Sequence, residues 1–182
     1  QELNLKWQPK NLAAQANLKI KESTGQFAFA NGLDIELTGD LTPDRLKQLR
    51  LQFQQQGHAV GRLSLSGPIL AEQDMAQFKV VAKDINRQVL NFAGQSWGLD
   101  FHGTVLNSTN TLTIWNRGRE YHVLGHIDAA PLHLSRHRVP FPALDSAKLQ
   151  YAIKANLHEK KVTLEAFHLK ATHQEQPVLV GK

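Results

Sequence analysis

Apolar and polar residues alternate along most of this chain with a period of two. The alternation is clearest over residues 12–20, 33–39, 61–67, 97–105 and 147–157. Because successive side chains of a β-strand point to opposite faces, each segment would have one apolar face and one face rich in Lys, Gln, Asn, Thr and Asp. The pattern therefore predicts an all-β fold built on a large antiparallel sheet that is buried on one side.

Short turn signals separate the alternating segments. They fall at Gly25, 31–32, 39–40, Gly57, 67–68, 107–108, 117–118 and 159–160. Turns this frequent predict a meander of β-hairpins, and they argue against units in which a helix connects two parallel strands.

Two segments allow a helical interpretation. A threonine-proline pair predicts a short helical turn near 43–48. Residues 71–85 fit both helical and strand spacing, and we predict a strand that starts near Gln77, with a helical turn left open at 71–76. Helices are therefore expected to be a minor part of the fold.

One long irregular connection is marked by Pro131 and by the proline-rich stretch 139–142. Proline has no N–H to donate to a central strand ladder, so we expect this connection to lie outside the sheet. It would be either a lid or a seam between subdomains.

Small residues occupy several of the apolar positions. Glycine weakens a strand, so its repeated use there has three readings: sharp curvature of the sheet, close approach of a ligand to the backbone, or ordinary bulges. The residues concerned are Ala14, Ala16, Gly39, Gly61, Gly67, Gly103 and Gly125.

Length and composition narrow the class of protein. A chain of 182 residues can bury one sizeable core, so we expect a single domain over 1–182. It has no cysteine and no run of about 20 apolar residues that would cross a bilayer. Because it opens on Gln1 and ends in strand-like sequence, we expect a processed segment of a longer protein, with any membrane anchor outside it.

Nine histidines are candidate metal ligands. His122 and His126 fall on polar positions of a predicted strand, where residues four apart lie about 13 Å from each other and cannot share an ion. We therefore expect a solvated pair and no metal or cofactor. The most basic local patch has two open interpretations, a contact with phosphate headgroups or a plain exposed loop. Its residues are His133, Arg136, His137 and Arg138.

The chain lacks the residue patterns that usually carry catalysis. It has no nucleophile elbow, glycine-rich phosphate loop or Cys/His pair, and the spacing of its acidic residues selects no acid–base couple. Its three tryptophans are not interleaved with Lys or Arg, as a base-stacking platform would require. We expect neither enzymatic activity nor nucleic-acid binding, although the net charge of +5 favours contact with phosphates.

Two stretches carry a resemblance: 61–70, which reads Gly-Arg-Leu-Ser-Leu-Ser-Gly-Pro-Ile-Leu, and 78–86, which reads Phe-Lys-Val-Val-Ala-Lys-Asp-Ile-Asn. They resemble the repeating strand units of the AsmA-like superfamily, which includes the AsmA and TamB proteins. Residues 103–115 and 125–134 are similar to further units, and 139–151 is similar to the segment that introduces a late strand block in AsmA proteins.

The resemblance implies a long, strongly twisted sheet curled into an open groove with an apolar interior, the form called a β-taco. Proteins of this kind are anchored in the inner membrane of Gram-negative bacteria and extend through the periplasm. They are implicated in phospholipid transfer to the outer membrane or in outer-membrane protein assembly. This chain would be a periplasmic segment of such a cell-envelope protein, and it departs from the family in its missing anchor and its proline-containing connection.

The residues themselves agree with a groove, because exposed apolar patches beyond a few hundred Å² are rare on soluble proteins, so the sheet must either fold over itself or hold something. An acyl chain of about 16 methylene groups, at about 0.8 kcal/mol each, would gain on the order of 12 kcal/mol there. We expect Lys and Arg at the rim to meet phosphates. The residues predicted to line the groove are Leu63, Leu65, Leu99, Phe101, Leu149, Tyr151 and Ile153.

Two functions follow as expectations. The first is a groove that binds or conducts phospholipid, or another acyl-chain lipid, between the inner and outer membranes. The alternative is a structural module whose apolar face is the core of a closed sandwich, and whose strand edges pair with outer-membrane β-barrel assembly proteins. The two differ in packing, because a sandwich has two sheets about 10 Å apart, whereas a groove leaves its lining accessible.

Overall fold

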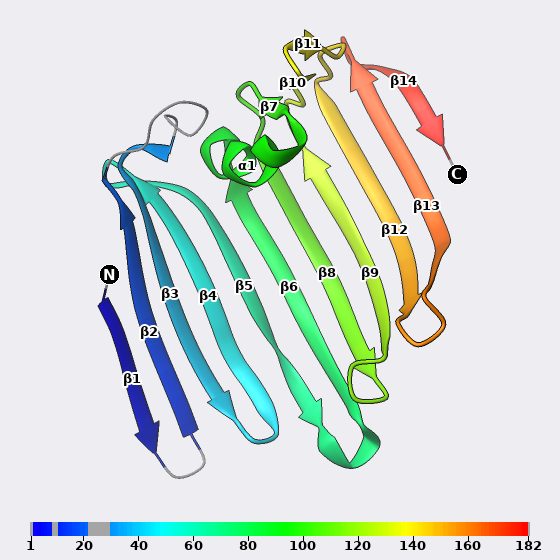
Figure 1. Cartoon of the computed structure of the whole chain (residues 1–182). Helices are drawn as coiled ribbons and strands as arrows, with labels where there is room; N and C mark the ends of the chain where they lie inside the picture. Colours follow the sequence, from blue (N-terminus) through cyan, green and yellow to red (C-terminus); the bar gives the residue numbers. More distant parts are fainter. Residues whose placement is uncertain (1, 9–10, 22–29, 182) are drawn as a thin grey trace.

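A single antiparallel sheet of eleven strands dominates the computed structural model, which describes residues 2–8, 11–21 and 30–181. The strands lie in chain order, each paired with its neighbour (Figure 1). They are β1 (Glu2–Gln8), β2 (Asn11–Ile20), β3 (Leu33–Thr42), β4 (Arg45–Gln55), β5 (His58–Leu70), β6 (Met75–Ile85), β8 (Leu106–Trp115), β9 (Glu120–Ala129), β12 (Ser146–Asn156), β13 (Lys161–His173) and β14 (Gln176–Gly181). The predicted all-β meander is confirmed.

A small additional unit interrupts the meander twice, and we call it the cap. Its helix α1 (Arg87–Gly94) and the 3₁₀ turn η3 (Gln95–Trp97) follow β6. Its three-stranded sheet combines segments on either side of β8 and β9. These strands are β7 (Leu99–Phe101), β10 (Leu134–Arg136) and β11 (Val139–Pro140).

The strand register places the apolar positions of neighbouring strands side by side. Leu37 pairs with Leu51, and Leu51 in turn pairs with Leu63. Further along the sheet, Val123 pairs with Ile153. One surface of the sheet, the apolar face, therefore carries the apolar positions of β2 to β13, and the opposite surface, the polar face, carries the intervening residues.

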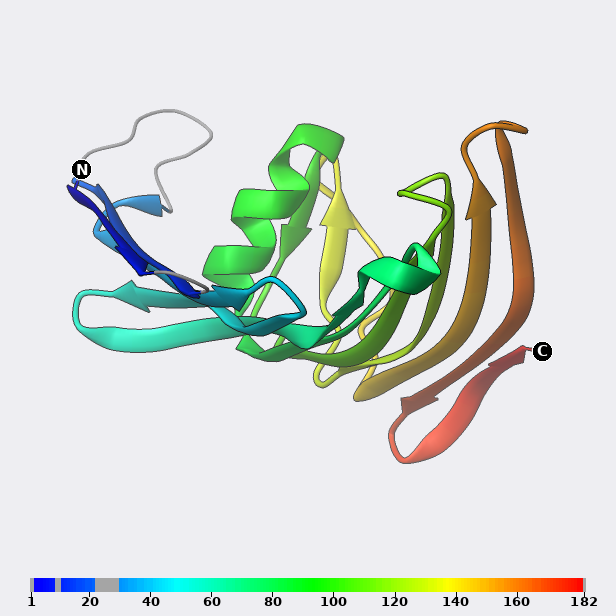
Figure 2. The ribbon, with the colours of Figure 1, turned by 90° about the horizontal axis from the view of Figure 1, so that it is seen from below.

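The sheet curls into an open trough, and the cap lies on its concave side at one end (Figure 2). Val60 and Ile85, at the ends of β5 and β6 that meet the cap, are buried. Ile85 pairs with Leu106 at an apolar position of β8, so the apolar face is the one that the cap covers, and it is the concave face. The edge strands β1 and β14 are not paired with each other, and the sheet does not close into a barrel.

The sheet is a single layer over most of its area. A compact monomer of 20.4 kDa would expose about 8,800 Å², whereas this chain exposes 12364 Å². In the part of the chain that the structure describes, no second large sheet packs on the apolar face, so the closed-sandwich interpretation is wrong. The few buried apolar residues are Ala30, Leu33, Val60, Ile85, Ala129, Ala152 and Ala171.

The helical turn expected near 43–48 is wrong, because β4 already begins at Arg45 and only two residues form the turn. The Thr42 hydroxyl donates a 2.8 Å hydrogen bond to Asp44, and this bond lowers the pKa of that carboxyl. At 71–76 the 3₁₀ turn η2 (Ala71–Gln73) confirms the open helical reading. Strand β6 then starts two residues before the predicted Gln77.

Several other local expectations are corrected. Turns expected at 39–40, 67–68 and 107–108 lie inside β3, β5 and β8, because the strands continue through them. The segment 97–105, expected as one strand of the main sheet, belongs largely to the cap. Gly25 lies outside the described residues.

Helix α1 was not predicted. Its start is set by Asn86, whose side chain accepts a hydrogen bond from the backbone N–H of Gln88, the usual arrangement at a helix N-terminus. At eight residues it is short. Among the described residues, none of the helices has the length and apolarity that crossing a membrane requires.

Candidate functional site

The apolar face of the trough is a continuous surface rather than a set of separate clusters. One transverse row runs through Leu49, Leu65 and Val80 on three successive strands. Beyond the cap, the side chains in the middle of this face are half-buried, because they touch their neighbours in the sheet but no other described segment covers them. The trough thus offers accessible apolar area along its length.

Near the C-terminal edge the apolar face becomes still more open. Val162 of β13 is 74% exposed and Leu164 is 57% exposed, although both occupy apolar positions. Leu179, in the edge strand β14, is 50% exposed. Val162 and Leu164 are neighbours on one face of β13, whereas Leu179 pairs with Ala171 near the other end of that strand. Neighbouring exposed apolar residues indicate a surface for binding, since isolated ones are common and need no explanation.

Five of the seven predicted lining residues lie on this face. Leu63 and Leu65 belong to β5, and Leu149, Tyr151 and Ile153 belong to β12, all of them half-buried. Three strands separate the two groups, so they lie about 19 Å apart along the curved sheet, at about 4.8 Å for each strand spacing. The structure therefore brings the five onto one surface without bringing the two groups into contact.

Leu99 and Phe101 are placed elsewhere. They lie in β7, inside the cap, and not in the main sheet. A methyl group added at Gly94 of α1 would lie 3.0 Å from the Phe101 ring and 3.1 Å from Leu99. These two residues therefore pack against the helix, and their expected position on the sheet face is corrected.

A small polar cluster lies within the apolar face, near its centre. The Tyr151 hydroxyl donates a 2.8 Å hydrogen bond to Oδ1 of Asn110, and Nδ2 of Asn110 donates a 3.2 Å bond to the Ser108 hydroxyl. Asn110 and Tyr151 reach each other across Gly125 of the intervening strand β9, which is paired with both. A Cβ at position 125 would collide with the Asn110 side chain, so glycine is required for this contact.

Sequence reasoning identified Tyr151 and Gly125 separately and missed their partner Asn110. The signal was present, because Ser108 and Asn110 break the apolar series that Leu112 and Ile114 continue on the same strand face. This break can be interpreted only when the register of three strands is known.

Burial raises the pKa of the Tyr151 phenol.

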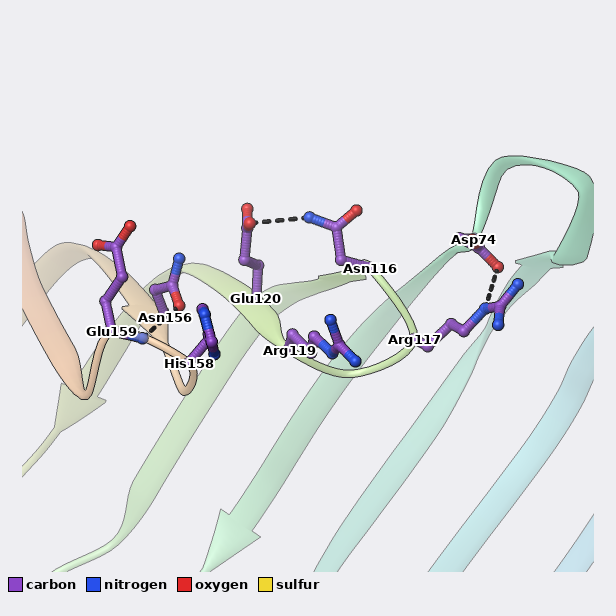
Figure 3. A pocket seen from close by; sticks show the side chains of 8 residues that line it. All are labelled: Asp74, Asn116, Arg117, Arg119, Glu120, Asn156, His158 and Glu159. Carbon is purple, nitrogen blue, oxygen red and sulfur yellow. Dashed lines mark hydrogen bonds and ion pairs between the residues drawn. The ribbon is translucent and has the colours of Figure 1, made fainter.

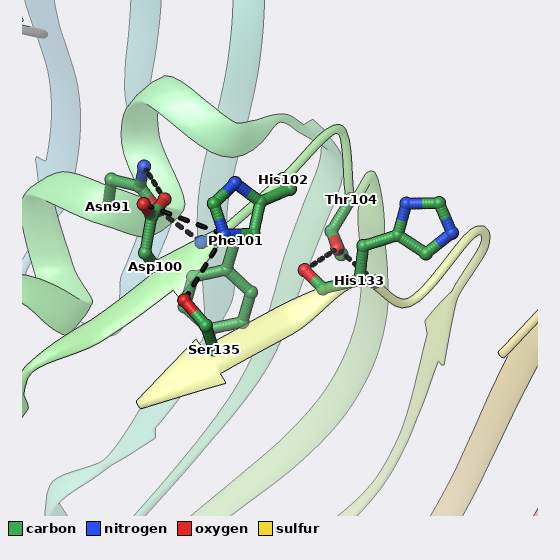
Figure 4. A network of polar contacts seen from close by, with 7 residues as sticks. All are labelled: Asn91, Asp100, Phe101, His102, Thr104, His133 and Ser135. Atoms are coloured by element: carbon green, nitrogen blue, oxygen red, sulfur yellow. Dashed lines mark hydrogen bonds and ion pairs between the residues drawn. The ribbon is translucent and has the colours of Figure 1, made fainter. Parts of the chain in front are cut away.

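Side chain and backbone hydrogen bonds hold the cap together (Figure 4). Asn91 of α1 donates a 2.7 Å bond to Asp100, and its carbonyl oxygen accepts a 2.7 Å bond from the backbone N–H of Phe101. The buried hydroxyl of Thr104 accepts a 3.0 Å bond from the backbone N–H of His133. The first pair attaches the helix to β7, and the second attaches the two chain segments of the cap to each other.

The predicted basic patch lies in this cap. His133 precedes β10, Arg136 ends it, and His137 and Arg138 form the turn before β11. Arg136, His137 and Arg138 are exposed. The ring of His137 occupies the space where a side chain at Gly98 would lie. The four residues are therefore grouped at the capped end of the trough.

The opposite end carries a polar hollow of about 440 Å³, formed by turns between strands (Figure 3). Arg117 lies 3.1 Å from Asp74 of a neighbouring turn, and Asn116 donates a 2.8 Å bond to Glu120. Acidic and basic groups are mixed here and partly paired. The hollow therefore has neither the sign of charge nor the apolar lining that would select a ligand class.

The polar face has one compact charged group. Lys154 Nζ lies 2.7 Å from Glu165, which is the extra residue of a bulge in β13, and His122 Nε2 lies 3.1 Å from the same carboxylate. The Lys154 hydrogen bond is the largest cause of a lowered pKa of Glu165, with smaller contributions from its charge and from His122.

The two histidines of the expected solvated pair differ. The His122 side chain is 19% exposed and stacks on Trp115 with ring centroids 6.1 Å apart, so the prediction of a solvated side chain is wrong for it. His126 is 50% exposed and lies 3.8 Å from Asp128. Within residues 2–8, 11–21 and 30–181, no group of three or more His, Cys, Asp or Glu side chains is arranged to hold a metal ion.

Comparison with known proteins was made at the levels of family, sequence and structure. No protein-family model matches the chain, and no curated protein or solved structure gives a significant match. The resemblance to AsmA-like proteins therefore stays a prediction from the residues that carry it. Function has to be argued from the geometry of the trough.

Proposed function

We propose that this chain binds an acyl-chain lipid, such as a phospholipid, on the concave apolar face of its sheet. The observation that carries the proposal is a continuous apolar face whose side chains stay only half-buried in a single-layer sheet. A surface of this kind is unfavourable in water unless it is covered, and an acyl chain covers it without requiring a second protein layer.

The magnitude of the hydrophobic effect suits transfer. Burying about 16 methylene groups at about 0.8 kcal/mol each contributes on the order of 12 kcal/mol. The same hydrophobic free energy holds the acyl chain in a bilayer. The free energies of the lipid in the membrane and in the trough would therefore be nearly equal. Because the trough is open along its length, the lipid would enter from the side and would not have to pass through the end of a closed barrel.

The capped end supplies a site for the headgroup. Arg136 and Arg138 are exposed there, beside His133 and His137. Guanidinium groups recognise phosphate by paired hydrogen bonds as well as by charge. The lipid would lie with its phosphate toward the cap and its acyl chains on the apolar face, and no step of this binding requires catalysis.

The setting follows from the AsmA-like resemblance. The chain would act in the periplasm as one segment of an envelope protein, tethered to the inner membrane by a part not present here. It would carry phospholipid toward the outer membrane.

A second candidate function rests on the edge strand β14. Pairing of this edge with a partner strand would support assembly of outer-membrane β-barrel proteins. It is favoured by the exposure of Val178 and Leu179 at this edge.

The test is native mass spectrometry of the purified chain, with lipid extraction, for the wild type and for Leu63→Asp. Leu63 is in the middle of the apolar face, so the aspartate would place a charge against the acyl chain. The matched control is Ser66→Asp, which puts the same charge on the opposite face of the same strand. Circular dichroism establishes that each variant is folded, and Leu65→Asp serves as a second variant if Leu63→Asp does not fold.

The proposal predicts co-purified lipid in the wild type and in Ser66→Asp, and loss of lipid from a folded Leu63→Asp. A wild type that carries no lipid and takes up none from added phospholipid vesicles would refute it. If such a lipid-free chain instead binds an unstructured peptide that forms a strand on the β14 edge, this would support the second function.

A further inference from the structure

The polar cluster Ser108, Asn110 and Tyr151 is surrounded by apolar side chains. In the transverse row of Asn110 the neighbouring positions are Val80 on one side and, beyond Tyr151, Phe167 on the other. Ile127 and Val123 lie on either side of Gly125 along β9. Three polar side chains at the centre of the apolar face lower the affinity of that face for a hydrocarbon chain. Their presence therefore requires an explanation.

The hydrogen bonds within the cluster leave two donors unused. Tyr151 gives its only proton to Asn110, and Asn110 gives one of its two amide protons to Ser108. In the described residues, the Ser108 hydroxyl proton and the second amide proton of Asn110 have no acceptor. The cluster therefore presents two neutral donors and no charged group toward the trough.

We infer that this cluster binds the ester carbonyl oxygen of a lipid, so that the trough selects acyl esters over ether-linked chains of equal length. This inference rests on the proposed function. A carbonyl oxygen has two lone pairs and no charge, which matches two neutral donors. Tyr151 acts as a positioning residue, because its bond to Oδ1 turns the amide protons of Asn110 away from itself and holds the side chain over Gly125.

The donors gain most from a ligand acceptor when water is displaced. A bound acyl chain would cover the cluster and exclude water from it, so a donor left without a partner would then weaken binding. An ester supplies the missing acceptor at that point, whereas an ether oxygen is a poorer acceptor. The discrimination therefore appears only when the apolar face is occupied.

The experiment compares two phosphatidylcholines with the same headgroup and chain length, one ester-linked and one ether-linked. Each displaces a fluorescent fatty acid from the purified chain. We expect the ester lipid to bind about threefold to tenfold more tightly, the effect of one neutral hydrogen bond. In Asn110→Leu and in Ser108→Ala, each of which leaves a donor in place, this ratio should fall, and in the double variant, which removes both donors, it should fall to about one.

Thr109→Val is the matched control, because Thr109 lies on the same strand between the two donors but faces the polar side of the sheet. It should keep the preference. Equal binding of both lipids by the wild type would refute the inference and leave the proposed function standing. Persistence of the full preference in a folded double variant, Ser108→Ala with Asn110→Leu, would also refute it, and failure of both lipids to bind would refute the function itself.

Discussion

Tyr151 and Asn110, which stand on strands that are not adjacent, are joined by a 2.8 Å hydrogen bond over the backbone of Gly125. The bond crosses β9 and so connects β8 to β12. It forms only because the middle strand has no side chain at the crossing point. Curvature also helps, since the concave face brings side chains from alternate strands closer together than a flat sheet would.

Replacing Gly125 with alanine should displace Asn110 and break this bond. A Cβ there would collide with the amide, and overpacking of this kind destabilises by about 1–3 kcal/mol. Urea unfolding followed by circular dichroism measures the loss. Gly39→Ala is the control, because its Cβ would approach no atom more closely than Leu49 Cδ1, at 3.3 Å, so its stability should change by less. Equal stability of Gly125→Ala and wild type would contradict the packing described.

Alkaline pH should weaken the fold through Tyr151. Because burial raises the pKa of this phenol above its ordinary value of 10.0, the folded state holds the proton more tightly than the unfolded state does. The stabilising effect is fully present below about pH 10 and is lost as the pH rises through the folded pKa. Urea unfolding at pH 8 and at increasing alkaline pH would measure this loss.

Tyr151→Phe separates this effect from other alkaline titrations. The chain has only two tyrosines, so Tyr121 is the only one that remains in the variant. The tyrosinate absorbance curve of the wild type minus that of the variant therefore reports the titration of Tyr151. The variant should lose less stability than the wild type over the same pH range. A Tyr151 curve centred at or below pH 10 would contradict the raised pKa.

Acid should weaken the fold through Glu165. Its pKa is lowered chiefly by the hydrogen bond from Lys154, so the unfolded state binds the proton more tightly. The contribution is present above the ordinary value of 4.5 and is lost as the pH falls through the folded pKa. The stability difference between wild type and Glu165→Gln should therefore shrink on acidification. Urea unfolding at neutral pH and below pH 4 measures it, and a difference that grows in acid would reverse the assignment.

The cap arginines should govern the preference for anionic headgroups. In the double variant Arg136→Gln, Arg138→Gln, binding to phosphatidylglycerol vesicles should weaken about threefold to tenfold at low salt, with a smaller change at high salt. Vesicle flotation measures the bound fraction. The control changes the same number of charges on the polar face, at Arg62 and Lys83, which are paired across β5 and β6. Equal losses in both variants would mean that only net charge matters.

Alternation predicted the strands and their faces well, because a sheet with one buried face tolerates no slip in strand register. Leu37, Leu51 and Leu63 could therefore be placed on one surface before their pairing was known. The fold class and the five lining positions on β5 and β12 follow from the same rule. Sheet curvature was one of the three interpretations that the glycines at apolar positions left open.

The errors have identifiable physical reasons. Gly67 looked like a turn, but a side chain there would collide with the backbone of Gln77, so this glycine accommodates an adjoining strand. Leu99 and Phe101 alternate like a sheet strand, yet α1 and the cap provide another surface for them to pack on. The bond between Asn110 and Tyr151 depends on two registers and a curvature that no local pattern contains.

Because each strand of the main sheet pairs with the strands beside it in chain order, the protein is nearly one-dimensional in its energetics. Its stability is approximately a sum over neighbouring strand pairs, as in solenoid proteins, with the cap and the Tyr151 crossing as the longer-range terms. Opening can then begin at either edge and stop partway. Such a molecule can open or fray at β14 while its central strands stay folded, so the width of the trough can change without global unfolding.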